Sequence, residues 1–398
     1  MSAPRTIIAL EQALALPYAT QRFAQLGWRV VRVETPGAPG KRAGDPNRYI
    51  GADLGHPDLH AYFIAPNVGK EAITIDLKRP EGRALLLRVM RALKADVFMC
   101  NTLPRRYHEL GISFAQLRAA NPALVWCGIS AMGPDEPDRA GYDPALQALI
   151  GFTHLTGEAD GPPVPCGIPI IDLKAGDEAF IQVLLALLEN DPAGRELHIS
   201  MARCAASWLI TALPQLAFAQ SDRELPRRSG NEHRSFIPSN AYPTQDGHAY
   251  LAIGNDSQWE RLTAQPGYKG LATEARRSNA GRMREKDRIY AEISEITRRT
   301  TTGAFVAQCM ALGLSAAPVN DLRGVGVLPL VRQHALRTTL PDGREVQLHP
   351  SASGSSFLEE RRNELPCAPR LGEHTDAVLR EAGLHATEID ALRKQRVI

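Results

Sequence analysis

The stretch TIIALEQALALPYATQRFAQLGWRVVRVE, from Thr6 to Glu34, contains the first strand, helix and strand of the chain. Residues 6–10 form a short, largely apolar stretch, the segment up to Gly27 is typical of a helix that ends on glycine, and residues 28–34 alternate as a strand does. A turn at 35–37 stops the second strand. Strand, helix and strand in this order predict the opening of a parallel α/β unit.

The same alternation continues along the first half of the chain. Strands are expected at 72–77, 96–100, 124–129 and 197–201, and helices at 79–93, 114–120 and 205–218. Repeated alternation of this kind predicts a doubly wound parallel sheet. A polar, basic segment at 221–238 indicates a boundary. After it, strand and helix patterns to about Leu328 predict a smaller α+β domain, and the remaining segment ends in a helix from Asp376 to about Val397.

Length and composition bound the class of protein. A chain of 398 residues predicts two domains or more, and a formal net charge of +2 gives no electrostatic case for nucleic acid or an anionic membrane. Six scattered cysteines without a C-x-x-C pair, no secretion signal and no apolar run of roughly 20 residues predict a cytoplasmic protein without a membrane partner. The sequence has no P-loop, no G-x-S-x-G elbow and no histidine pair with ligand spacing, so we expect neither a metal site nor a permanently bound cofactor.

One carboxylate, Asp172, follows an apolar run and precedes a long helical pattern. Residues 168–171 have the β-branched composition of a short buried strand, and from Leu173 apolar residues recur at helical spacing. Asp172 is therefore expected where the N–H groups of a new helix favour negative charge. Locally, a helix N-cap is the more common role for such an aspartate.

Polar residues at predicted strand ends indicate a phosphate-rich ligand. Lys78 follows one strand, and Asn101 ends the next, with Arg105 and Arg106 shortly after it. Ligands of open α/β sheets collect at such strand ends. The loop around Arg42 and Arg48 either binds a phosphorylated ligand or is only a solvated surface loop.

With these segments in place, the sequence resembles the family III CoA-transferases, the superfamily of formyl-CoA transferase and α-methylacyl-CoA racemase. The resemblance covers essentially the whole chain. Its motifs, in chain order, are Gly27–Glu34, Gly44–Arg48, Gly69–Lys78, Ala95–Asn101, Gly141–Asp143, Gly167–Gly176, Gly230–Asn231, Asp246–Gly247 and Ala368–Asp376.

The resemblance implies an architecture. It implies a Rossmann-like large domain with a parallel sheet, built from residues 1–222 and from residues 329–398 returning to it, and a small domain at 223–328. It also implies two subunits interlocked as a homodimer.

The resemblance also implies a set of site residues. Asp172 matches the nucleophile. Residues that look like contacts of the CoA substrate, with neighbours that could replace missing ones, are Leu14, Ala15, Ile75, Asp76, Leu77, Lys78, Asn101, Thr102, Leu103, Arg105, Arg139 and Tyr142. Two arginines of the family pattern are absent, because Thr35 and Glu109 stand in their places; Arg105, Arg106 or Arg139 could substitute.

The implied chemistry is consistent with a carboxylate of ordinary pKa, near ~3.9, which is ionised at neutral pH and can attack a thioester without a base. The expected reaction moves CoA from an acyl-CoA, such as succinyl-CoA, to a free carboxylic acid through an aspartyl anhydride and an aspartyl-CoA thioester. The helix N-terminus is expected to stabilise the oxyanion.

Two alternatives remain open. The first is an acyl-CoA racemase or epimerase, although Tyr142 stands where that branch has a histidine, and a phenol is a poor base at neutral pH. The second is a non-catalytic CoA-binding subunit. Asp143 is either an orienting carboxylate of the site or the N-cap of a helix at 144–149.

Overall fold

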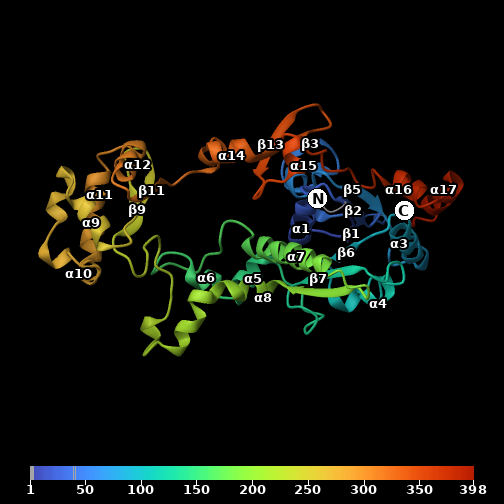
Figure 1. Cartoon of the computed structure of the whole chain (residues 1–398), viewed down its shortest axis with the longest axis horizontal. Helices are drawn as coiled ribbons and strands as arrows, with labels where there is room; N and C mark the ends of the chain where they lie inside the picture. The colour runs from blue at the N-terminus through green and yellow to red at the C-terminus, as the bar shows by residue number, and fades with distance from the viewer. Residues whose placement is uncertain (1–3, 39, 41) are drawn as a thin grey trace. The chain divides into compact units, whose positions relative to one another are not determined.

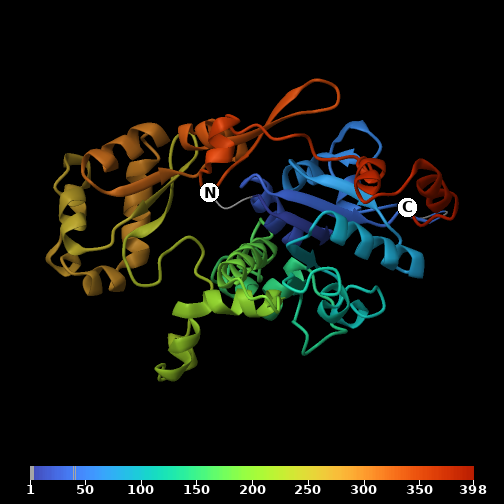
Figure 2. The same ribbon diagram turned by 45° about the vertical axis from the view of Figure 1, so that its right-hand side comes forward.

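The computed structural model describes residues 4–38, 40 and 42–398, and the chain divides into two compact units (Figures 1 and 2). Unit 1 comprises Met1–Ile150, Cys166–Phe218 and Pro329–Ile398, and unit 2 comprises Gly151–Pro165 and Ala219–Leu328. Residues 151–165, which were expected in the large domain, group with unit 2. None of the helices in the described part of the chain has the length and apolar character that crossing a membrane requires.

A six-stranded parallel sheet forms the centre of unit 1 and confirms the α/β prediction. In spatial order its strands are β5 (Glu71–Thr74), β2 (Arg29–Glu34), β1 (Thr6–Leu10), β6 (Val97–Cys100), β7 (Val125–Ser130) and β8 (Arg195–Ser200). Every residue of β6 and β7 is buried, as expected for parallel strands covered on both faces.

Helices cover both faces of this sheet. One face packs in a single apolar core with α3 (Pro80–Ala92), α4 (Phe114–Leu117), α16 (Thr375–Glu381) and α17 (Ala386–Lys394). On the other side of β7 and β8 lies α7 (Ile170–Glu189), which packs along α1 (Ala15–Ala24). Figure 1 shows the C-terminal helices beside α3, so the two ends of the chain belong to one core.

Shorter elements complete unit 1. A separate apolar cluster joins α2 (Ala61–Asn67) to the hairpin of β12 and β13 and to α15. The remaining elements of the unit are β3 (Asp53–His56), β4 (Leu59–His60), α5 (Asp143–Leu149), α8 (Met201–Ser207), α14 (Pro329–His334), β12 (Ala335–Thr339), β13 (Glu345–Pro350) and α15 (Ser356–Glu360).

Unit 2 has its own core, formed around Trp259, Ile293 and Phe305. An antiparallel sheet in the order β11 (Ser315–Pro318), β10 (His248–Ala252) and β9 (Ser239–Pro243) packs with helices, which gives the predicted α+β architecture. Its helices are α6 (Phe152–Leu155), α9 (Asp256–Thr263), α10 (Asn279–Arg284), α11 (Lys286–Thr297), α12 (Thr302–Ala311) and α13 (Leu322–Gly326).

The predicted strand at 168–171 was wrong. Helix α7 already begins at Ile170, and its buried face runs at four-residue intervals through Ile171, Ala175 and Ala179. Ile168, which the strand would have buried, is 57% exposed. The helical period therefore extends further back than the β-branched composition suggested.

Two predicted helices are also divided. The final helix is two, α16 and α17, because Gly383 adopts a positive φ of 77° between them. The helix predicted at 205–218 begins earlier, at Met201, and gives way after Ser207 to two 3-10 segments, the second of which contains Pro214. Proline has no N–H to continue an α-helical ladder.

Candidate active site

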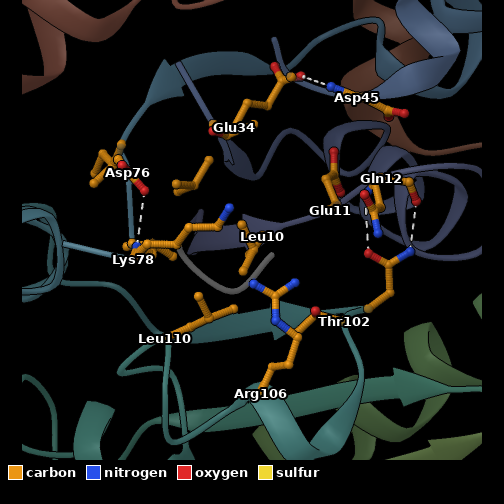
Figure 3. A pocket seen from close by; sticks show the side chains of 16 residues that line it. Leu10, Glu11, Gln12, Glu34, Asp45, Asp76, Lys78, Thr102, Arg106 and Leu110 are labelled. Atoms are coloured by element: carbon orange, nitrogen blue, oxygen red, sulfur yellow. Dashed lines mark hydrogen bonds between the residues drawn. The ribbon is translucent and has the colours of Figure 1, made fainter. Parts of the chain in front are cut away.

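The strand order of the sheet reverses between β1 and β6, and two cavities lie at the carboxyl ends of these strands. At such a reversal the loops that follow neighbouring strands leave in opposite directions and open a crevice. The first, which we call the Lys78 cavity, has a volume of about 220 Å³ (Figure 3). The second, the Asp172 cavity, has a volume of about 260 Å³. The two adjoin, because Gln12, Asn101, Thr102 and Arg106 line both.

Most of the predicted ligand residues line these two cavities. The Lys78 cavity is lined, among others, by Ile75, Asp76, Leu77, Lys78, Asn101 and Thr102. The Asp172 cavity is lined, among others, by Ala15, Asn101, Thr102, Leu103, Tyr142 and Asp172 itself. Leu14 is the N-cap of α1, next to Ala15, and does not line either cavity. The structure thus brings together residues that are up to 157 positions apart between Ala15 and Asp172.

Three arginines near this edge differ in position. Arg105 pairs with Asp138 at 3.4 Å and Arg139 with Glu136 at 2.8 Å, and neither lines the cavities. Arg106, by contrast, lines both, and Figure 3 shows its guanidinium and the Lys78 ammonium group directed into the Lys78 cavity. The sequence placed Arg105 and Arg106 side by side, and only the 3-10 turn at Pro104–Arg106 separates their directions.

The loop between β1 and α1 is held in a strained conformation. Ala13, which lines the Asp172 cavity, has a positive φ of 60°. Its N–H donates to Asp45 at 3.1 Å, and its carbonyl accepts from Asn47 at 2.8 Å. Asn101 holds the neighbouring residue, since it accepts from the Gln12 N–H at 3.1 Å and donates to the Gln12 carbonyl at 2.7 Å. The Gly44–Arg48 motif therefore orders a wall of the site.

Arg48 does not have the ligand role that one interpretation of its loop allowed. Its side chain is fully buried, donates to Glu34 at 2.5 and 2.8 Å, and also donates to the Pro369 carbonyl at 2.9 Å. It connects the 45–58 loop to the C-terminal segment. A guanidinium so fully paired in the core is structural and is not available to bind a phosphate.

Helices α1 and α7 approach closely at Gly176. A Cβ atom at this position would lie 2.7 Å from the Ala15 carbonyl oxygen and 2.7 Å from the Tyr18 ring. Gly176 is one turn after Asp172, on the same face of α7. The absence of a side chain at Gly176 therefore sets how near the start of α1 comes to Asp172.

Asp172 is the third residue of α7, and its own N–H is already bonded. The N-cap is Pro169, so Asp172 is not the cap that the local pattern favoured. Asp143, on α5, caps α7 instead: its Oδ2 accepts from the Ile171 N–H at 2.7 Å and from the Asp172 N–H at 3.1 Å. Nor does Asp143 cap its own helix, whose N-cap is Tyr142. Since Asp143 occupies these amides, they are not free for an oxyanion, contrary to the expectation from the sequence.

The surroundings of Asp172 change its ionisation. Burial, and next the negative charge of Asp143, raise the pKa of Asp172 from its ordinary value of 3.8 to about 7. The premise of an ordinary pKa was therefore wrong. Tyr62, on α2, lies close enough that burial and then the charges of Asp172 and Asp143 raise the pKa of its phenol. Sequence patterns gave no signal for Tyr62.

The rest of the Asp172 cavity is mostly small or apolar. Ala131, Ala140, Gly141 and Met201 line it. Tyr142 lines it too and is 79% exposed. Among the residues that the structure describes, no group of three or more His, Cys, Asp or Glu side chains is arranged to hold a metal ion. The arrangement offers one partly buried carboxylate to a reacting carbonyl, with Arg106 in the lining of the same cavity and Lys78 in that of the adjoining one.

Comparison with known proteins gives consistent matches over nearly the whole chain. The family model described as CoA-transferase family III matches residues 4–375. The succinate–glutarate CoA-transferase of Agrobacterium fabrum is 33% identical over 94% of both chains. The succinyl-CoA:glutarate CoA-transferase of Mus musculus is 27% identical over 94% of this chain and 85% of that one. The crystal structure of a CAIB/BAIF family protein from Brucella suis matches with a TM-score of 0.80 and 27% identity, over 95% of this chain and 98% of that one.

Proposed function

The chain belongs to CoA-transferase family III, and from this membership we propose that Asp172 is the nucleophile of the transfer. The protein is a CoA-transferase and moves CoA between an acyl-CoA and a free carboxylic acid. The observation that carries the proposal is that Asp172 lies in a cavity that adjoins the Lys78 cavity at the sheet reversal. Transfer of this kind needs a carboxylate beside a site for the CoA thioester.

The proposed cycle has four steps. An Asp172 carboxylate oxygen attacks the thioester carbonyl and expels CoA thiolate, which leaves a mixed anhydride. The thiolate then attacks the aspartyl carbonyl of the anhydride, giving an aspartyl-CoA thioester and the donor acid as carboxylate. The acceptor carboxylate attacks this thioester, forming a second anhydride and again a thiolate. Attack of that thiolate on the acceptor acyl carbon gives the product acyl-CoA and regenerates Asp172. Holding the thiolate beside the anhydride favours its return over hydrolysis.

A pKa of about 7 suits the proposed attack by the Asp172 carboxylate. Near neutral pH about half of the carboxylate is ionised and can attack, while a carboxylate that is more basic is also the stronger nucleophile. The same burial that raises the pKa keeps water away from the anhydride.

We assign oxyanion stabilisation to the first turn of α1 in place of α7. The α7 amides bond to Asp143, whereas α1 has Leu14 as N-cap with no side-chain hydrogen bond, and Ala15 lines the Asp172 cavity. Amides in the first turn of a helix point along its axis and favour negative charge. The strained loop at Ala13 aims this turn at the site.

Two cations are proposed to hold the phosphate groups of CoA. Lys78 and Arg106 are directed into the Lys78 cavity (Figure 3), and Arg106 also lines the Asp172 cavity. Arg106 thus replaces the family arginines that are missing at Thr35 and Glu109. The neighbouring backbone at 75–78 and 101–103 would contact the rest of the CoA, and Tyr142 the acyl portion.

We propose a dicarboxylic acid as acceptor and succinyl-CoA as donor. Relatives of this chain are named for succinate with glutarate, for succinyl-CoA with mesaconate and for succinyl-CoA with D-citramalate. These relatives are named as transferases, and Tyr142 is an exposed phenol, so a racemase or a non-catalytic subunit has less support. We propose that CoA enters as a thioester substrate and that no cofactor is bound permanently.

We also propose that the large domain is Rossmann-like and that the protein forms a homodimer. The strand order, which reverses between β1 and β6, supports the Rossmann-like assignment. Apolar side chains stay exposed along one segment of unit 1, where Ile210, Leu216 and Phe218 are 76%, 64% and 77% exposed. Such a run on a single chain is typical of a surface that a second subunit covers. Four buried and two partly buried cysteines, all of them free, support the reducing cytoplasm as the compartment.

Covalent trapping tests the assignment of Asp172. Wild-type protein incubated with succinyl-CoA and then hydroxylamine should carry a hydroxamate on Asp172 alone, located by mass spectrometry of peptides. Asp172→Asn, matched in shape, should show no adduct and no transfer of CoA to glutarate. Asp177→Asn, on the same helix, is the control and should still form the adduct. Turnover at the wild-type rate in Asp172→Ala would sink the proposal.

A further inference from the structure

Gln147 is a buried amide that hydrogen-bonds both to Asp143 and to the segment that precedes α7. It lies on α5, one turn after Asp143, and its side chain is 1% exposed. Its Nε2 donates to Asp143 Oδ1, and its Oε1 accepts from the Cys166 N–H at 2.8 Å. Asp143 uses its other oxygen for the Ile171 and Asp172 N–H groups. A single relay therefore runs from Cys166 through Gln147 and Asp143 to the first turn of α7.

The direction of this relay is fixed by its ends. A backbone N–H can only donate, so the Cys166 N–H requires the carbonyl oxygen of Gln147 on its side. The NH2 group of Gln147 must then face Asp143, where it requires an acceptor. The far end is fixed in the same way, because the Ile171 and Asp172 N–H groups also require an acceptor. Asp143 is thus acceptor on both sides, which suits a carboxylate and not an amide.

We propose that Gln147 is a positioning residue for the transfer reaction, which locks the Asp143 carboxylate in the orientation that caps α7 and thereby holds Asp172 against the acyl group. The inference rests on the proposed role of Asp172 as nucleophile. Gln147 does not line either cavity, so it acts through Asp143 and not through substrate. Its second bond, to Cys166, anchors the connection that leads into α7 four residues later.

The alternative is that Gln147 is only a well-satisfied core amide. A merely structural residue would affect stability, whereas a residue that orients Asp143 also affects the ionisation of Asp172, since the charge of Asp143 is one cause of its raised pKa. Other ionisable side chains around Asp172 are those of Tyr62 from α2 and of Arg106 and Tyr142, which line the same cavity. These side chains remain unchanged in the variants below.

The test exchanges amide and carboxylate within the relay. Asp143→Asn alone sets an NH2 group against that of Gln147, and Gln147→Glu alone sets a carboxylate against that of Asp143. Each should lower kcat about 10- to 100-fold, with the KM for succinyl-CoA changed less than about 3-fold, as expected for a displaced nucleophile.

The double variant, Asp143→Asn with Gln147→Glu, restores every bond of the relay. The carboxylate introduced at position 147 accepts from the Cys166 N–H and from the NH2 group introduced at position 143. The amide oxygen introduced at position 143 accepts from the Ile171 and Asp172 N–H groups. The donors and acceptors are therefore all matched again, with the negative charge moved from one side chain to the other.

The double variant should recover kcat to within about 5-fold of wild type, well above the product of the two single effects. Because its negative charge lies one side chain further from Asp172, its kcat/KM should rise with pH through a lower midpoint than in wild type. If a single variant is too unstable to assay, its melting temperature is compared instead, and the double variant should melt above both.

Strictly additive losses in kcat and in melting temperature would overturn the role of Gln147. Recovered melting temperature without recovered kcat would also overturn it, because it would leave Gln147 purely structural. The proposed function is judged separately by Asp172→Asn, which must be inactive whatever the outcome of the exchange.

Discussion

The close approach of α1 and α7 at Gly176 leads to a prediction in which stability and activity separate. In Gly176→Ala the new Cβ would lie 2.7 Å from the Ala15 carbonyl oxygen and 3.4 Å from the Ala19 nitrogen. Contacts of this kind to backbone need about 3.4 Å, so α1 must move away by roughly 0.5–0.7 Å. The first turn of α1, with Ala15 in the lining of the Asp172 cavity, moves with it.

Two opposing effects decide the stability of Gly176→Ala. Overpacking costs about 1–3 kcal/mol, whereas replacing a mid-helix glycine with alanine gains about 1 kcal/mol. The net loss is therefore only about 0–2 kcal/mol, or a fall in melting temperature of less than about 5 °C. Activity is affected more strongly, because a displacement approaching 1 Å at a reacting centre lowers the rate by about 10- to 100-fold.

The assay is CoA transfer from succinyl-CoA to glutarate, together with thermal unfolding followed by circular dichroism. Gly167→Ala is the matched control: this glycine lies three residues before α7, and no atom lies within 4 Å of its Cβ position. It should keep wild-type kcat and melting temperature. Wild-type kcat in Gly176→Ala would refute the argument that the spacing of α1 and α7 sets the site.

Three further predictions concern single side chains. Because the pKa of Asp172 is raised to about 7, kcat/KM should fall about tenfold per pH unit below that value. The folded protein should also lose stability as pH rises from about 4 to 7, because in this range Asp172 ionises freely only in the unfolded chain. Asp172→Asn should therefore raise the melting temperature at pH 8 by the equivalent of about 1–2 kcal/mol, after allowance for partial exposure, and leave it unchanged near pH 4. Arg106→Leu should raise the KM for succinyl-CoA about 10- to 100-fold, as loss of a charged phosphate contact implies. Arg105→Leu loses only a surface pair with Asp138 and should change this KM less than about 2-fold. Equal effects of the two variants on the KM would contradict the assignment of Arg106. Tyr62→Phe should lower kcat about 10-fold without changing the KM, because it removes a phenol close to Asp172, the proposed nucleophile. An unchanged kcat in steady-state assays would show that this phenol takes no part.

Much of the fold could be predicted because the signals are local. Apolar alternation located the strands of the parallel sheet, and Gly27 marked a true break between α1 and β2. Since parallel strands end at a common edge, the approximate neighbourhood of Lys78 and Asn101 also followed. Asp172 follows no strand, so its place beside them depends on how α7 packs. The errors lay at 168–171, 205–218 and 376–397, where the boundary of a helix depends on what its faces pack against.

The resemblance pointed to Asp172 as the proposed nucleophile, and the sequence pattern predicted the helix that carries it, but neither could predict the surroundings of Asp172. Which of Arg105 and Arg106 lines the two cavities depends on one 3-10 turn. That Asp143 caps α7, 28 residues away, and that Gln147 orients it depends on how α5 packs against α7.

Sequence periodicity follows from the repeat of a single element, so it reports strands, helices and the edge where they end. Hydrogen bonds, burial and charge act through space between elements, so the raised pKa of Asp172, the close contact at Gly176 and the relay through Gln147 existed only once the chain had folded.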